Sequence, residues 1–370
     1  MEKFNNTAID NEERYSLSNH EYSETTPPLA EMPKFTEQMI ADFREYFLDN
    51  GYSETPPVKI TSGVDETVRF VGSHISPMKE YFLNENIPED GMIMSQPCVR
   101  TRNYPKLLDD TFVPAWGSYF KSLGVLVRPE KIEELCDQSI EYLLSVVKIP
   151  RENLTLRVNK EDTDLYNLAD KYRSLDIGYD DSSMPEKYYR HKLGVEGVWG
   201  RNFNYAINAN GTLHDIGNLI ILENAEKQFG VELALGTSTI LKHYFNLPHV
   251  NSANPVPDIE NLDSPLRFKF EDSMITSAVL LSEGLRPSAS DNKERILRSY
   301  LRGIIYFKNK LDIPSDAVVQ MMHEFESSQN LNHEGSDFIK DYIPSAEQSL
   351  LSQKDTSPEE QKLLEVLRSK

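Results

Sequence analysis

Cysteine is scarce in this 370-residue chain. Cys98 and Cys136 are its only two cysteines, too few for a disulfide framework or a thiolate zinc site. The eight histidines show no metal-ligand spacing, so we expect no metal bound by the protein itself. No apolar run approaches the ~18–20 residues that a membrane span needs, and the first residues hold no signal-peptide stretch. We therefore expect a cytoplasmic protein without membrane contact.

Positive charge is also in short supply. Lys and Arg number 39 against 59 Asp and Glu, which gives a net charge of −20 at pH 7. A field of this sign repels phosphate backbones unless basic groups are concentrated locally, which argues against a general nucleic-acid coat protein. The 39% hydrophobic content, with 17 Gly and 21 Pro, is that of a globular chain, neither disordered nor collagen-like.

The length predicts two main domains. Residues 1–33 are acidic with little aliphatic periodicity, which is typical of a disordered tail. Strand and helix patterns mix through 34–249 without a regular βαβ alternation, and the Pro, Asn and Asp residues of 250–265 mark a linker. Beyond it the pattern is helical, over a domain at 266–345 and a C-terminal tail at 346–370. The predicted fold class is α+β followed by an all-α domain.

Individual elements follow from periodicity and residue type. We predict helices over 35–50, 130–147, 273–285 and 290–311, and strands over 67–71, 111–113, 154–158 and 219–222.

Three short motifs stand out in the sequence: KEYFL at 79–83, SQPCVRT at 95–101 and LLSEGLRPS at 280–288. They resemble K-P-Y-F-L, S-Q-x-C-[IV]-R-A and F-L-I-A-D-G-x-x-P-S of the alanyl-tRNA synthetase family. Such matches keep their order from about residue 37 to 312. The resemblance implies a class II aminoacyl-tRNA synthetase-like antiparallel sheet flanked by helices, and amino-acid activation with ATP and Mg²⁺. The family's His/Cys editing motif has no counterpart here.

Arginines are the candidates for binding ATP. Arg100 matches a family arginine, and the resemblance implies that it contacts the α-phosphate and the amino-acid carboxylate. A guanidinium suits this task because it stays charged and donates two parallel hydrogen bonds. Arg102 would point to the same side of an extended strand. A solvated surface arginine is the alternative for both, and Gly236 keeps the register of the family's nucleotide-binding motif 3.

The same resemblance gives three candidates for binding a small, alanine-like amino acid, namely Asn218, Glu232 and Trp199. Asn218 matches an asparagine that reaches the amino acid, although an asparagine satisfied by a neighbouring loop is the alternative. Glu232 stands where the family has an aspartate for the ammonium group. Trp199 and Arg201 replace prolines or cysteines of a glycine-spaced run, so they are expected to add bulk and charge to the pocket.

Two departures from the family concern the nucleotide. The motif 3 arginine is Thr239 here, and the motif 2 glutamate is Pro114. A hydroxyl in place of a guanidinium should weaken nucleotide binding unless another cation substitutes.

One local excess of positive charge suggests tRNA as a partner. Residues 286–310 hold seven basic and two acidic side chains, and Arg295, Arg298 and Arg302 share one helix face. The resemblance assigns this helix pair to the tRNA acceptor stem, and an ordinary solvated face is the alternative.

Two functions follow from the sequence. The first is a ligase that forms an aminoacyl adenylate and transfers it to tRNA or to a small biosynthetic acceptor. The second is an inactive synthetase paralogue that binds an amino acid, tRNA or protein partner.

Overall fold

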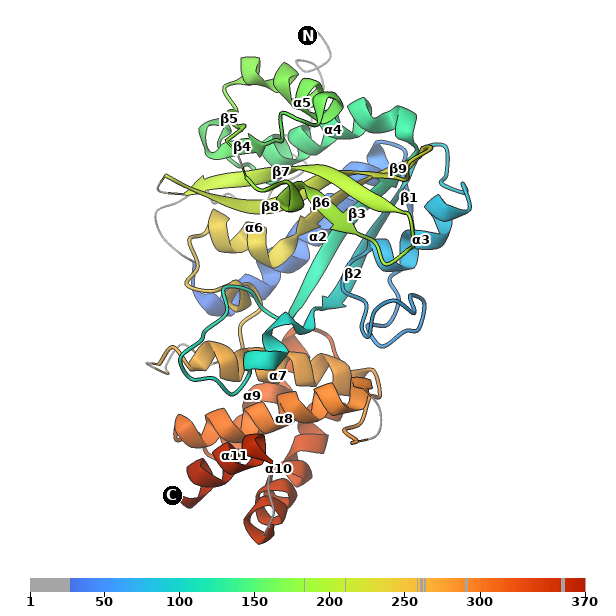
Figure 1. Ribbon diagram of the computed structural model, residues 1–370. Coiled ribbons are helices and arrows are strands. Elements are labelled where there is room, and N and C mark those ends of the chain that lie inside the picture. The colour runs from blue at the N-terminus through green and yellow to red at the C-terminus, as the bar shows by residue number, and fades with distance from the viewer. Residues whose placement is uncertain are drawn as a thin grey trace.

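The computed structural model describes residues 27–369 except 183, 210, 258, 260, 261, 263, 290, 291 and 354–356. A nine-stranded sheet with its helices forms one part, and five C-terminal helices form the other, at the end of the sheet where β2 finishes (Figure 1). Within the described residues, no helix is both long and apolar enough to cross a membrane. This arrangement confirms the α+β fold class with an all-α region after it.

The sheet is antiparallel at its centre and parallel at its edges. Its order is β1-β2-β3-β9-β8-β7-β4-β5, with β6 paired to β7. Only the edge pairs β1–β2 and β4–β5 are parallel among the described strands. The strands are β1 Ser53–Glu54, β2 Met92–Val99, β3 Tyr119–Val127, β4 Leu154–Arg157, β5 Gly178–Asp180, β6 Arg190–Lys192, β7 Trp199–Ala209, β8 Thr212–Glu223 and β9 Gln228–Gly236.

Side-chain alternation gives the sheet one apolar and one largely polar face. Leu123, Leu219 and Leu233 belong to a core that helices α2 (Met32–Asp49), α4 (Ile132–Glu141) and α6 (Thr237–Tyr244) complete. Their strand neighbours point to the opposite face. That face is only partly covered, by α3 (Ile75–Leu83). Polar residues of β3, β7, β8 and β9 lie on the same face, where all but the half-buried Asn218 are buried: Ser122, Asn202, Asn204, Asn218 and Glu232.

The C-terminal helices form their own core. They are α7 Arg267–Ser282, α8 Asn292–Lys310, α9 Ser315–Ser328, α10 Glu334–Ser352 and α11 Pro358–Arg368. Gly303 allows α7 and α8 to pack closely, because a Cβ there would lie 2.6 Å from the Ser273 Oγ. The core also takes in Ile60, Phe70 and Leu107 from before β3.

The sequence-predicted helices are present, and two predicted strands are wrong. Residues 67–71 and 111–113 form turns and irregular chain. In each, a threonine bonds to an aspartate two residues before it: the Thr67 backbone N–H donates to Asp65 at 3.1 Å and the Thr111 N–H to Asp109 at 3.0 Å. Such aspartate turns compete with strand pairing.

The proposed domain boundaries stay predictions. Residues 1–26, most of the predicted acidic tail, lie outside the described residues, and α2 begins at Met32. In the predicted linker, residues 250–256 are buried. Helix α10 runs across the predicted boundary at 345/346.

Candidate active site

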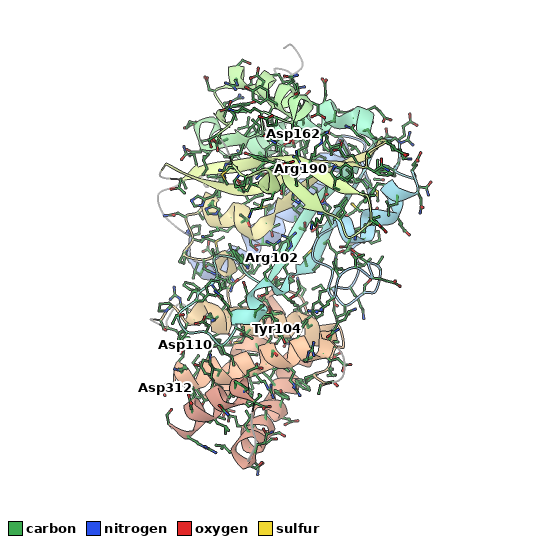
Figure 2. All side chains as sticks on the ribbon, viewed as in Figure 1. Arg102, Tyr104, Asp110, Asp162, Arg190 and Asp312 are labelled. Carbon is green, nitrogen blue, oxygen red and sulfur yellow. The ribbon has the colours of Figure 1, made fainter. Side chains whose placement is uncertain are left out.

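A cavity of about 490 Å³ opens on the polar face of the sheet, where β3, β8 and β9 meet the loop after β2 and the start of α6. Figure 2 shows Arg102 between the sheet and the C-terminal helices. The lining residues are Ser73, Arg100, Arg102, Trp116, Gly117, Tyr119, Phe120, Ser122, Asp215, Ile216, Gly217, Asn218, Ala234, Leu235, Gly236, Ser238, Thr239 and Val250. Four sequence candidates, Arg100, Arg102, Asn218 and Gly236, therefore meet at one cavity.

The two arginines give the cavity its positive charge. Both side chains are exposed. The Nε of Arg100 donates to the Gly72 carbonyl at 2.7 Å, and its guanidinium carbon lies 4.8 Å from the centre of the Phe120 ring. These contacts orient the guanidinium fork. Neither arginine forms an ion pair with an acidic side chain of the described residues, so both charges are available to an anion.

A bulge in β8 brings Asp215 to the cavity. Tyr205 pairs with Gly217 and Ala206 with Asp215, so Ile216 has no partner on β7. In a regular strand Asp215 and Asn218 would point to opposite faces, whereas the extra residue lets both line the cavity. Asp215 accepts hydrogen bonds from Arg157 at 3.1 Å, from Asn204 at 3.1 Å and from the Tyr188 hydroxyl.

Asparagines form the floor beside Asp215. The Asn218 side-chain amide donates to Asn204 Oδ1 at 2.5 Å, and Asn202 donates to the same oxygen. Asn218 is half-buried, whereas Asn202 and Asn204 are buried. The carbonyl oxygen of Asn218 thus remains for a ligand, while its amide is held by the floor.

Glu232 lies behind the cavity wall and does not line it. Its carboxylate Oε1 is 3.0 Å from Nε2 of His74, and the two side chains are 2% and 0% exposed. His74 Nδ1 lies 2.8 Å from the hydroxyl of Ser122, which does line the cavity. Gly124 makes room for this ring, because a Cβ there would lie 1.8 Å from it. The sequence-based role of Glu232, binding an ammonium group, is therefore not supported by its contacts.

The C-terminal helices hold one wall of the cavity. Asp272 of α7 is 2% exposed and accepts hydrogen bonds from Ser118 N at 2.6 Å, Ser118 Oγ at 2.7 Å and Asn103 at 3.1 Å. Tyr300 of α8 lies 2.9 Å from the same Ser118 hydroxyl. Burial raises the pKa of Asp272. Since Arg102 precedes Asn103 and Gly117 precedes Ser118, this network fixes both lining residues.

His249 secures a second part of that wall. Its Nε2 donates to the Pro114 carbonyl at 2.7 Å, and its Nδ1 accepts from Asn251 N at 3.2 Å. Burial lowers the pKa of His249 to about 4, although the bond to Pro114 opposes the shift. Pro114, where a nucleotide-contacting glutamate was expected, thus serves as a backbone acceptor outside the cavity.

The first turn of α6 also borders the cavity. Gly236, Ser238 and Thr239 line it, and α6 begins at Thr237. The N-terminus of a helix carries partial positive charge and free N–H groups. Thr239 therefore lies in the first turn of α6 and lines the same cavity as the two arginines.

Two residues expected in the amino-acid pocket lie elsewhere. The Trp199 indole donates to Glu223 at 3.2 Å. Arg201 pairs with Asp164 at 2.8 Å and with Glu223. These bonds raise the pKa of Arg201. Neither Trp199 nor Arg201 lines the cavity, so the expected bulk and charge do not enter it.

The basic face of α8 is partly neutralised. Arg302 is 13% exposed and pairs with Glu359 at 3.7 Å and with Glu360, both on α11. Arg295 is exposed and donates to Asn292 at 2.6 Å. Arg298 is half-buried. The three arginines do not form an open cationic stripe.

Sequence reasoning missed Asp215, Ser122 and His74. Asp215 and Asn218 belong to the same segment, DIGN at 215–218, but Asp215 faces the cavity only because of the bulge in β8. His74 and Ser122 carry no motif signal, and 158 residues of chain separate His74 from Glu232, so their contact follows from the fold alone.

Comparison of sequences shows that the chain is similar to alanine–tRNA ligases. No protein-family profile matches it. The alanine–tRNA ligase of Staphylococcus saprophyticus is 22% identical over 370 aligned residues, which cover 83% of this chain and 40% of that protein. The alanine–tRNA ligase of Caldicellulosiruptor saccharolyticus is 24% identical over 148 residues, or 39% of this chain and 16% of that protein. The chain thus spans less than half the length of these relatives.

Solved structures give weaker matches. The aspartyl tRNA synthetase of Entamoeba histolytica superposes with a TM-score of 0.38 at 10% identity, over 61% of this chain and 57% of that one. The asparaginyl-tRNA synthetase of Pyrococcus horikoshii, complexed with asparaginyl-adenylate, gives 0.36 at 12% identity, over 61% and 67%. In sequence, the chain is distantly similar to alanine–tRNA ligases, at 20% identity over 315 residues and 22% over 370 residues.

Proposed function

We propose that the cavity is the active site of an ATP-dependent ligase that activates a small carboxylic acid as its acyl adenylate. The observation that carries the proposal is a pair of guanidinium groups, Arg100 and Arg102, that have no ion-pair partner among the described residues and line a cavity large enough for a nucleotide. An isolated pair of cations in a protein of net charge −20 needs an anionic partner. The similarity to alanine–tRNA ligases supports ATP as that anion.

The proposed reaction is an in-line displacement at phosphorus. A carboxylate oxygen of the substrate bonds to the α-phosphorus, the bond to the bridging oxygen breaks, and pyrophosphate leaves. Arg100 would hold the substrate carboxylate and an α-phosphate oxygen in one fork, so that the two reactants are aligned and the growing negative charge is stabilised. Arg102 would bind the outer phosphates, and the Asn218 carbonyl would orient the acid.

The lining residues fit ATP but do not fit Mg²⁺ bound by the protein. Arg102 and the first turn of α6 supply positive charge to the cavity that Thr239 lines, where the family arginine is missing. Asp215 is the single carboxylate among the lining residues, and three donors already bind it. No step of the proposed reaction depends on a protein-bound metal ion.

The acceptor of the acyl group is tRNA or a small molecule. Arg295 and Arg298 support tRNA, whereas the pairing of Arg302 with α11 weakens that support. A small-molecule acceptor would reach the adenylate through the cavity opening without needing the basic face.

Exchange of labelled pyrophosphate into ATP tests the proposal. Exchange that depends on an added small carboxylic acid is the expected result, since formation of the adenylate is reversible. Absence of exchange across amino, hydroxy and unsubstituted acids of two to four carbons would contradict it.

A second candidate is a binding protein without catalysis, which Thr239 and Pro114 favour. Calorimetry separates the two functions. Micromolar binding of an acid or of tRNA with no ATP binding would support the second candidate.

A further inference from the structure

The carboxylates around the cavity are already partnered. Asp215 accepts from Arg157, Asn204 and Tyr188, and Glu232 contacts His74. Asp215 is the sole acidic lining residue, whereas two arginines line the cavity without an ion-pair partner among the described residues. The balance of available charge at the cavity is therefore positive.

His74 is fixed in its place from three sides. Ser122 lies 2.8 Å from its Nδ1, Glu232 lies 3.0 Å from its Nε2, and Gly124 lies beneath the ring. The imidazole is fully buried. The imidazole thus takes the contact with Glu232 that an ammonium group would need, and neither His74 nor Glu232 is among the lining residues of the cavity.

A buried ammonium group needs an anionic or otherwise free acceptor, because its desolvation is costly. The lining residues that the structure describes give such a group two arginine charges and, in Asp215, one carboxylate that already has three donors. An acid whose α-carbon carries hydrogen or a hydroxyl avoids this repulsion and still presents its carboxylate to Arg100.

We propose that the acid activated in this cavity carries no free α-ammonium group, and that His74 is the residue that excludes one. This inference rests on the proposed function and replaces the small amino acid expected from the sequence with a small hydroxy or unsubstituted carboxylic acid.

The first test compares acids that differ only at the α-carbon. L-lactate and propionate are matched to L-alanine, and glycolate to glycine. Saturation-transfer NMR in the presence of a non-hydrolysable ATP analogue measures binding, and pyrophosphate exchange measures activation. Lactate or propionate should bind at least about tenfold more tightly than alanine, which corresponds to ~1.4 kcal/mol.

The second test removes the imidazole. His74→Gly should raise alanine binding at least about tenfold, because Glu232 then becomes available to the ammonium group. Adding Glu232→Gln to His74→Gly should abolish this gain. His323→Gly on α9 is the matched control and should change neither acid's binding. The comparison of acids on the unchanged protein does not depend on how the variants fold.

The outcomes separate the inference from the proposed function. Preferred binding of lactate or propionate without exchange would support the inference and contradict catalysis. Exchange with alanine equal to or above that with lactate and propionate would overturn the inference and leave the proposed ligase function standing. Binding of none of these acids would also overturn the inference.

Discussion

At the residue scale, Arg100 is the side chain on which the proposed chemistry depends most. Its Nε is bound to Gly72 and its guanidinium packs against Phe120, so the fork is oriented before any ligand arrives. Preorganised donors of this kind stabilise developing charge without reorganisation in the reaction.

Arg100→Ala should lower pyrophosphate exchange by about 100-fold or more, the usual effect of removing one preorganised donor. Arg69→Ala, an exposed arginine outside the cavity lining, should retain full exchange. Equal rates for the two variants would remove Arg100 from the active site.

Sequence motifs identified the two arginines of the cavity but not the side-chain contacts around it. Arg100, Arg102, Asn218 and Gly236 were placed by motif and do line the cavity. Glu232 was also placed by motif, yet its partner His74 comes from a loop far away in the chain. Contacts of this kind depend on tertiary packing, which a motif does not encode.

At the scale of elements, helices α7 and α8 support the cavity from outside the sheet. Asp272→Ala would remove the acceptor of the buried Ser118 backbone N–H and one acceptor each from the Ser118 hydroxyl and the Asn103 amide. We expect the free energy of unfolding to fall by about 3 kcal/mol. Urea denaturation measures this, with Asp341→Ala on the exposed side of α10 as the control. Two equal losses would show that the network does not stabilise the wall.

The acidic residues of α11 should reduce the positive charge that α8 presents to a polyanion such as tRNA. Glu360→Gln can keep the capping box with Ser357 and removes one charge that pairs with Arg302. If tRNA is the acceptor, this variant should bind it more tightly at low salt, and Arg298→Glu should bind it more weakly. Filter binding across a salt series measures both. Unchanged affinity in both variants would mean that α8 does not contact tRNA.

Helices were more predictable from the sequence than strands. The apolar periodicity of α2, α4 and α8 is regular, so each was expected near its observed range. Helix α7 is buried on nearly all sides, and its start at Arg267 was not predicted. Strands β7 and β9 were not predicted, because polar residues that line the open face, such as Asn202, Asn204 and Glu232, interrupt their apolar pattern. At 67–71 and 111–113, aspartate turns prevailed over strand propensity.

At the scale of the whole molecule, two histidines, the buried His249 and the half-buried His243, should make stability depend on pH. Burial lowers the pKa of His249 to about 4, and burial with His214 and Lys242 nearby lowers that of His243 to about 3. As pH falls below about 6.5, the unfolded chain takes up protons that the folded chain does not, so the folded state loses stability. The loss should approach ~1.4 kcal/mol per pH unit for each histidine.

Denaturant unfolding at pH 7, 6 and 5 checks this dependence. His249→Gln has no titrating ring and should show a smaller decrease than the unchanged protein. Parallel decreases in the two proteins would show that His249 does not contribute.

The central claim is that the cavity joins a carboxylate to the α-phosphate of ATP. Its most direct test is to follow ¹⁸O from the labelled carboxylate of lactate, propionate and alanine during turnover. After hydrolysis of the adenylate, mass spectrometry should find AMP that carries one ¹⁸O atom. Unlabelled AMP, or ¹⁸O in inorganic phosphate released with ADP, would contradict the account.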